Sequence, residues 1–133
     1  MKKLMALTAF TVFTTAQAHW LDHLLQKVDN QSSCTLLLVD HYHSSDVTNH
    51  DAPLTIQPYS AGFIEMEGTA SSQYINSYAV ICDLQPVGLG QIFNSNKVRP
   101  DTALFFQGDG ISWDYYRSPL TRGYPAYVVV SNK

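Results

Sequence analysis

The stretch "FIEMEGTASSQYINSYAVIC", Phe63 to Cys82, decides the fold of this chain. In its first part, Ile64 and Met66 alternate with two glutamates, which places apolar and acidic side chains on opposite faces of a strand. Its second part, "QYINSYAVIC", is rich in tyrosine and β-branched residues, which favour strands over helices. A glycine and several small polar residues separate the two parts. The stretch therefore predicts two consecutive strands.

Similar short runs recur along the chain at near-regular intervals, with Gly, Pro, Asn and Asp between them. The further runs are "CTLLLV", "PLTIQPYSAG", "LGQIF", "TALFFQ", "ISWDYY" and "YPAYVVV". About eight short strands separated by turn signals are typical of an all-β sandwich or barrel. We expect an all-β fold, a small antiparallel β-sandwich.

The segment "HWLDHLLQKV" has a different pattern. Its apolar residues follow an i, i+1, i+4, i+5, i+8 spacing, which makes one stripe on a helix. They are Trp20, Leu21, Leu24, Leu25 and Val28. The spacing predicts a short amphipathic helix over residues 19–29. Because so short a helix is marginal alone, we expect it to dock on the sandwich.

The stretch "TALFFQGDGISWDYY", Thr102 to Tyr116, predicts a β-hairpin, because Asp-Gly between alternating apolar residues is the strongest short-range hairpin signal. With Asp109 and Gly110 as the turn, one face of the hairpin is wholly apolar and aromatic, and a turn at Gly108 and Asp109 keeps the same parity. The pairs on that face are Phe106 with Trp113 and Leu104 with Tyr115. The register therefore predicts that Trp113 and Tyr115 belong to the core.

The first eighteen residues have the pattern of a secretory signal. Two lysines precede the apolar run "LMALTAFTVF", and "AQA" supplies the small residues that a signal peptidase needs. We expect cleavage after residue 18, no transmembrane segment thereafter, and one domain over residues 19–133 in a secreted or periplasmic location. Without the two lysines, six basic residues remain against eleven acidic ones, a net charge of −5. This balance argues against nucleic acid or anionic lipid as the main partner.

The chain contains two cysteines, Cys34 and Cys82. Because an exported protein meets an oxidising environment, we expect them to form one disulfide.

The most chemical-looking stretch is "VDHYHSSDVTNHD", Val39 to Asp51. His41 and His43 are two apart, so on a continuing strand both imidazoles point to the same side, as in a metal site on a sheet. His50 would complete a set of three ligands suited to zinc or copper. The alternative is a polar loop with ordinary surface residues. His19, the expected mature N-terminus, offers a separate copper chelate through its amine and imidazole.

Aromatic residues and arginines gather near the C-terminus. Exposed aromatic rings stack on sugars or on other proteins, and arginine binds carboxylates with a planar fork. The hairpin register assigns Trp113 and Tyr115 to the core, so the surface candidates are the other members of the cluster. They are Tyr116, Arg117, Arg122 and Tyr124.

Three function classes follow. The first is an exported, non-enzymatic binding module that recognises a protein, glycan or envelope surface through the C-terminal aromatic and arginine region, with no cofactor. The alternative is an exported zinc- or copper-binding protein that uses His41, His43 and His50. A hydrolase built on the paired carboxylates of Glu65 and Glu67 is the third possibility, but no nucleophile motif accompanies them.

Overall fold

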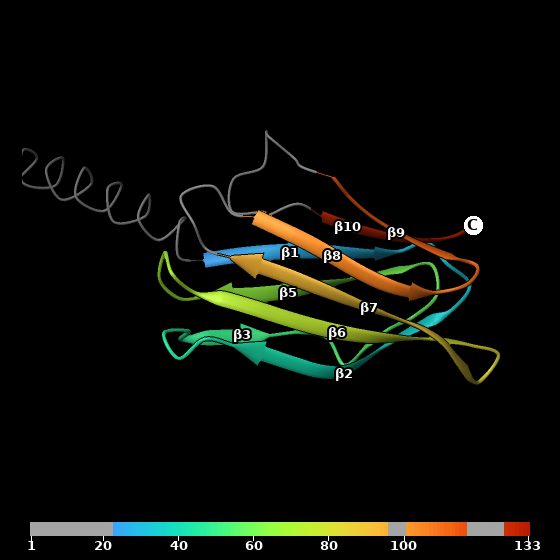
Figure 1. Cartoon of the computed structure of the whole chain (residues 1–133), viewed down its shortest axis with the longest axis horizontal. Coiled ribbons are helices and arrows are strands. Elements are labelled where there is room, and N and C mark those ends of the chain that lie inside the picture. The colour runs from blue at the N-terminus through green and yellow to red at the C-terminus, as the bar shows by residue number, and fades with distance from the viewer. Residues whose placement is uncertain (1–22, 96–100, 117–126) are drawn as a thin grey trace, which may run out of the picture.

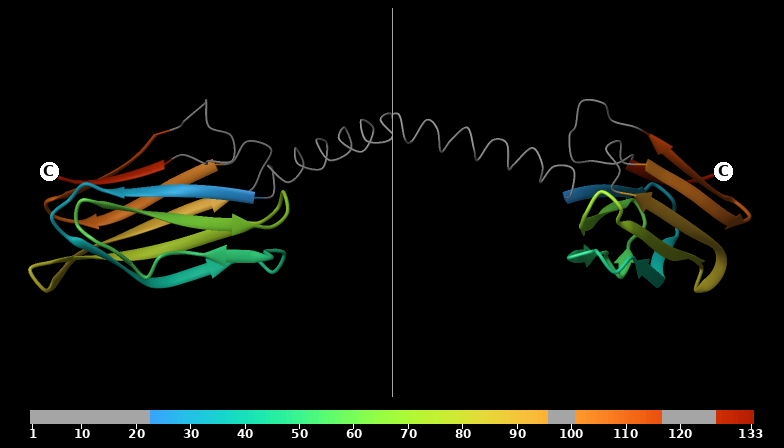
Figure 2. Two further views of the ribbon diagram at one scale, coloured as in Figure 1. Left: turned by 180° about the vertical axis from the view of Figure 1, so that it is seen from behind. Right: turned by 60° about the vertical axis from the view of Figure 1, so that its left-hand side comes forward.

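The structure is a computed structural model that describes residues 23–95, 101–116 and 127–133. Its described part contains ten strands in two five-stranded sheets (Figures 1 and 2). The strands are β1 (His23–Asn30), β2 (Thr35–His43), β3 (Asn49–Asp51), β4 (Thr55–Ile56), β5 (Ser60–Glu67), β6 (Gln73–Cys82), β7 (Gln85–Ser95), β8 (Asp101–Gly108), β9 (Ile111–Tyr116) and β10 (Tyr127–Asn132). The all-β prediction is confirmed. No helix among the described residues is long and apolar enough to cross a membrane.

The strand order of the first sheet is β3-β5-β1-β10-β9, and that of the second sheet is β4-β2-β6-β7-β8. In Figure 1, β6, β7 and β8 lie in front of β1 and β5. All neighbours are antiparallel except β1 and β10, which pair in parallel with Val28 opposite Val128. The expected antiparallel sandwich is therefore correct for all but one pair of strands.

The core lies between the two sheets and is built from alternate residues of each strand. In β5, Ile64 and Met66 are fully buried, as their alternation with glutamates predicts. The other buried apolar residues come from both sheets: Leu24, Val28, Cys34, Leu36, Ile56, Tyr74, Tyr78, Val80, Ile92, Ile111, Trp113, Val128 and Val130.

The helix expected over residues 19–29 is wrong for the part that the structure describes, because His23–Asn30 is strand β1. Residues 19–22 lie outside the described residues. The buried side chains of β1 alternate: Leu24, Gln26, Val28 and Asn30. Two of these four are polar amides, so the period of two does not show in the hydrophobic pattern.

The burial of Gln26 is possible because polar partners face it from the other sheet. Its side-chain amide donates to Asn94 Oδ1 at 3.0 Å, and Asn94 Nδ2 donates to Gln26 Oε1 at 2.8 Å. The hydroxyl of Thr102 donates to the same Asn94 oxygen at 2.7 Å. Buried polar groups are tolerated when they are hydrogen-bonded, so this cluster joins the sheets through the core.

The hairpin expected at Asp109 and Gly110 is also wrong. The two strands are consecutive, but β8 pairs with β7 in the second sheet and β9 pairs with β10 in the first. A type I′ turn needs positive φ at both central residues, whereas here the glycines Gly108 and Gly110 have it, at 126° and 80°, and Asp109 does not. The segment is thus a crossover between sheets.

The disulfide between Cys34 and Cys82 is confirmed, with a Cα–Cα distance of 4.6 Å. It lies at the end of the antiparallel pair β2 and β6, next to the register pair Thr35 and Ile81. The bond therefore closes the end of two central strands of the second sheet.

Candidate functional site

Tyr116 is the C-terminal surface candidate that lies within the described residues. Its ring stacks on that of Tyr127, with centroids 5.4 Å apart, and half of its surface is exposed. Both tyrosines occupy one register pair at the ends of β9 and β10. Arg117, Arg122 and Tyr124 lie outside the described residues, so the rest of the expected binding region stays a prediction.

The neighbouring aromatic residues divide between core and surface. Trp113 is buried between the sheets, as predicted. Tyr115 is 47% exposed, so its predicted place in the core is wrong. Among the described residues β9 is an edge strand of the first sheet, with β10 as its one neighbour, so Tyr115 is covered from one side. Phe106, which is 45% exposed, lies at the matching edge strand β8 of the second sheet.

The outer face of the second sheet brings together four exposed apolar side chains, Leu37, Tyr42, Leu89 and Phe105. One row across β2, β6, β7 and β8 is Leu37, Ala79, Leu89 and Gln107. A second row is Tyr42, Ile75, Phe93 and Ala103. Between them lies the row Asp40, Ser77, Gln91 and Phe105. We call these twelve residues the outer apolar face.

Aromatic residues dominate one half of the outer apolar face. Tyr42 is 54% exposed and Phe105 is 63% exposed. The rings of Phe93 and Phe105 meet edge to face with centroids 5.3 Å apart. Large exposed apolar patches are uncommon on soluble monomers and mark sites of interaction. The sequence pattern does not reveal this face, because aromatic residues occur at both the inward-facing and the outward-facing positions of the strands.

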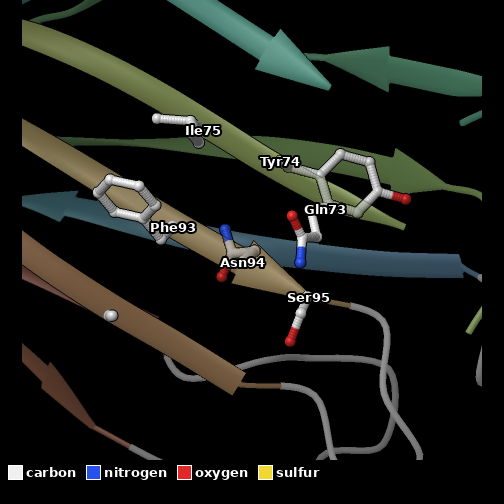
Figure 3. A pocket seen from close by; sticks show the side chains of 7 residues that line it. Gln73, Tyr74, Ile75, Phe93, Asn94 and Ser95 are labelled. Atoms are coloured by element: carbon white, nitrogen blue, oxygen red, sulfur yellow. The ribbon is translucent and has the colours of Figure 1, made fainter. Parts of the chain in front are cut away.

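A pocket of about 290 Å³ opens on the same half of the second sheet (Figure 3). It lies over β6, β7 and β8, where Ala103 is small and Phe93 and Ile75 stand beside it. Gln73 and Ser95, which form a register pair, add an amide and a hydroxyl. The pocket thus combines an aromatic ring with neutral hydrogen-bonding groups.

The histidine stretch is mostly strand, not the polar loop that the alternative interpretation describes. Strand β2 continues through His43, and His50 lies in β3. The predicted same-side pair is confirmed, because the rings of His41 and His43 both lie 5.6 Å from that of His50 between centroids. The structure therefore brings together all three histidines predicted as ligands.

A β-bulge explains why the histidines face inward. The register between β2 and β6 shifts between Leu38 and Asp40, so Val39 is an extra residue. Before the bulge, Leu36 lies opposite the buried Val80; after it, His41 and His43 lie opposite the buried Asn76 and Tyr74. Without the extra residue, His41 and His43 would point to the outer face.

His50 is half-buried, and its Nε2 atom makes no hydrogen bond. Burial lowers the pKa of its imidazole, and the nearby His41 and His43 lower it further. The side-chain amide of Asn76 acts in the opposite direction, although neither of its polar atoms forms a hydrogen bond of normal geometry. The result is a neutral imidazole at neutral pH beside an unpaired buried amide.

The loop between β2 and β3 is held in place by Asp46. Its carboxylate accepts hydrogen bonds from the hydroxyls of Ser44, Thr69 and Ser71, which hold the pKa of Asp46 well below its usual value. Thr69 and Ser71 belong to the loop between β5 and β6. This clamp fixes the position of β3, and with it the position of His50, relative to β2.

Comparisons with known proteins identify a similar fold and no family. No protein-family model and no curated protein matches the chain. Among solved structures, the chain is similar to the crystal structure of the RahU protein in complex with a TRIS molecule. That likeness has a TM-score of 0.51 and 10% sequence identity, and covers 86% of this chain and 97% of that one. Such low identity shows a shared fold alone.

Proposed function

We propose that this protein is an exported, non-enzymatic binding module that recognises a glycan through its outer apolar face. The observation that carries the proposal is the aromatic group of the exposed Tyr42 and Phe105 and the partly buried Phe93, next to a pocket with neutral polar groups. Sugar rings have apolar C–H faces that stack on aromatic rings, and hydroxyls that pair with amides. Ligand sites combine these two kinds of group in a concave surface.

The charges around this face favour a neutral ligand. Among the residues of β2, β6, β7 and β8, Asp40 and Asp101 are acidic, and none is lysine or arginine. Anionic ligands are recognised by arginine and lysine, so a neutral saccharide fits this surface better than a phosphate or sulfate ester. The absence of lysine and arginine from these strands also agrees with the expected net negative charge of the mature chain.

Export is supported by the disulfide, which persists in oxidising compartments, and by the signal-like pattern of the first eighteen residues. The direct test is the N-terminal sequence of protein recovered from the cell envelope and from the medium. Cleavage after Ala18 supports the proposal, and recovery of the uncleaved chain from the cytoplasm contradicts it.

The glycan proposal is tested on an array of neutral and acidic oligosaccharides, followed by calorimetry with the neutral glycan that binds. Phe105→Ala is expected to weaken that affinity about tenfold or more, because an exposed ring lost from the face does not disturb the core. Phe63→Ala is the matched control, since Phe63 is 48% exposed on β5 of the first sheet.

Other results would contradict the glycan proposal or place the glycan site elsewhere. No bound glycan, or an affinity that Phe105→Ala leaves unchanged, contradicts the proposal. A glycan whose affinity depends on Tyr116→Ala and not on Phe105→Ala moves the site to the C-terminal aromatic region.

A further inference from the structure

The three histidines meet where the two sheets approach each other along one edge. His41 and His43 come from β2 of the second sheet, and His50 comes from β3, an edge strand of the first sheet. Figure 1 shows β2 and β3 side by side. Each of the two ring separations from His50 is 5.6 Å. With zinc–nitrogen bonds of about 2.0–2.1 Å, two ligating imidazoles in tetrahedral geometry have centroids roughly 5 Å apart.

Unpaired polar atoms surround this meeting point. His50 Nε2 is buried without a hydrogen-bond partner, and so are both polar atoms of the Asn76 side chain. A buried donor or acceptor without a partner loses its hydration without replacement, so native structures rarely leave three of them together. The arrangement indicates that a further group belongs between His50 and the strand β2.

The other two histidines are free to supply nitrogen ligands. Both rings are exposed, so they turn about their side-chain bonds at little cost. His43 Nδ1 lies 3.1 Å from the carbonyl oxygen of Ser44. When Nδ1 donates to that oxygen, Nε2 keeps its lone pair for a metal, as in most protein sites with histidine ligands. By register His50 lies opposite the buried Met66, and Asp51 lies opposite Glu65.

We propose that His41, His43 and His50 bind one Zn²⁺ or Cu²⁺ ion at this edge of the sandwich. Three neutral imidazoles are ligands for borderline transition metals and not for Ca²⁺ or Mg²⁺, which need oxygen ligands. In the described part of the chain, no group of three or more His, Cys, Asp and Glu side chains already surrounds a single point. The exposed rings of His41 and His43 therefore rotate when the ion binds, while the buried His50 provides the fixed ligand.

A three-histidine set leaves the fourth position of a tetrahedral ion open. That position lies on the exposed side of the cluster, where His41 and His43 face solvent. A water molecule or a donor group of a partner occupies it. The site is thus separate from the outer apolar face, because the histidines point between the sheets and the aromatic residues point away from them.

The experiment is calorimetric titration of the signal-cleaved, tag-free chain with zinc chloride and, separately, with copper sulfate after treatment with a chelator. We expect one ion per chain with micromolar affinity or better. His41→Ala and His43→Ala should each weaken it at least tenfold, and the double variant should abolish it. Because both side chains are exposed, these variants keep the fold, whereas His50→Ala removes a half-buried ring and is read only after its folding is checked.

Two control variants isolate the site from the remaining histidines. His19→Ala removes the expected N-terminal copper chelate, and His23→Ala changes a histidine of β1. Both should leave zinc affinity unchanged. X-ray absorption of the zinc complex should show three nitrogen ligands of imidazole type. No heat with either metal, or zinc heat that persists unchanged in the His41→Ala/His43→Ala variant, overturns the proposal without bearing on glycan binding.

Discussion

The carboxylate of Asp46, in the loop between β2 and β3, accepts a hydrogen bond from the hydroxyl of Thr69, 23 residues further along the chain. Ser71 donates to the same carboxylate oxygen, and Ser44 donates to the other. Two backbone hydrogen bonds join the same loops: Ser44 N–H donates to the carbonyl of Gln73, and Thr48 N–H donates to that of Glu67. The loop that follows the first two histidines is therefore tied to the loop between β5 and β6, and His50 follows it into β3.

We predict that the stability that Asp46 contributes depends on pH. The three hydroxyl donors favour the charged carboxylate and keep its folded pKa below the ordinary value of 3.8. The contribution is therefore complete above about pH 4 and declines as the pH falls further, because protonation removes the acceptor. Asp46→Asn should lower the melting temperature at pH 7, and the difference from the unmodified protein should shrink between pH 4 and pH 2.

The matched control for Asp46 is Asp109→Asn, an exposed aspartate in the crossover between β8 and β9. It should change the melting temperature little at any pH. A difference between Asp46→Asn and the unmodified protein that stays constant from pH 7 to pH 2 would show that the charge of Asp46 is not what stabilises the clamp.

The indole of Trp113 packs against the backbone of Gly90, and this contact sets the local distance between the sheets. A Cβ atom on Gly90 would lie 2.4 Å from Cζ2 of Trp113. Gly90→Ala should therefore lower the free energy of unfolding by about 1–3 kcal/mol, as overpacking does in other cores. Urea denaturation measures the change. In a double-mutant cycle, Trp113→Leu should relieve part of the Gly90→Ala penalty; strict additivity would contradict the contact.

The hydrogen bonds of the buried Gln26 amide should contribute more to the free energy of unfolding than the volume of the side chain does. Gln26→Met keeps a similar size but leaves the Nδ2 group of Asn94 without its acceptor, which should cost about 1–3 kcal/mol of unfolding free energy. Gln107→Met, on the exposed edge strand β8, should change stability by less than about 0.5 kcal/mol. Equal effects of the two substitutions would argue against the buried hydrogen bonds as the cause.

Loss of the disulfide should cost a large share of the total stability. The bond joins residues 48 positions apart, and in the chain-entropy model a loop of that length stabilises the fold by on the order of 4 kcal/mol. Cys34→Ala/Cys82→Ala should lower the free energy of unfolding by about that amount, and a reducing agent should do the same to the unmodified protein. Identical denaturation curves with and without reductant would refute this prediction.

Local patterns in the sequence were enough to predict most strands and the disulfide. The bounds of β6 and β9 agree with the runs "QYINSYAVIC" and "ISWDYY", because alternation and β-branched content are properties of neighbouring residues. The same-side placement of His41 and His43 also follows from the two-residue period of a strand. The N-terminal strand was missed because Gln26 and Asn30 occupy buried positions.

Pairing between strands could not be predicted in this way. The sequence from Thr102 to Tyr116 has a strong local hairpin signal, yet its two strands join different sheets, because the inward-facing Trp113 packs on Gly90 across the core. The outer apolar face could not be predicted from the sequence for the same reason. Phe105 and Trp113 are both aromatic residues in strands, and only the position of each sheet decides that one is exposed and the other buried.

The histidine stretch shows most clearly which features depend on the local sequence and which depend on the tertiary structure. By itself the sequence determined the residue types, the strand period and the spacing of two imidazoles, all of which depend on local covalent geometry. The tertiary structure decided that the bulge at Val39 turns His41 and His43 inward, and that the Asp46 clamp brings His50 to them. These features depend on hydrogen bonds and packing between segments far apart in the chain, so their energies exist only once the two sheets have come together.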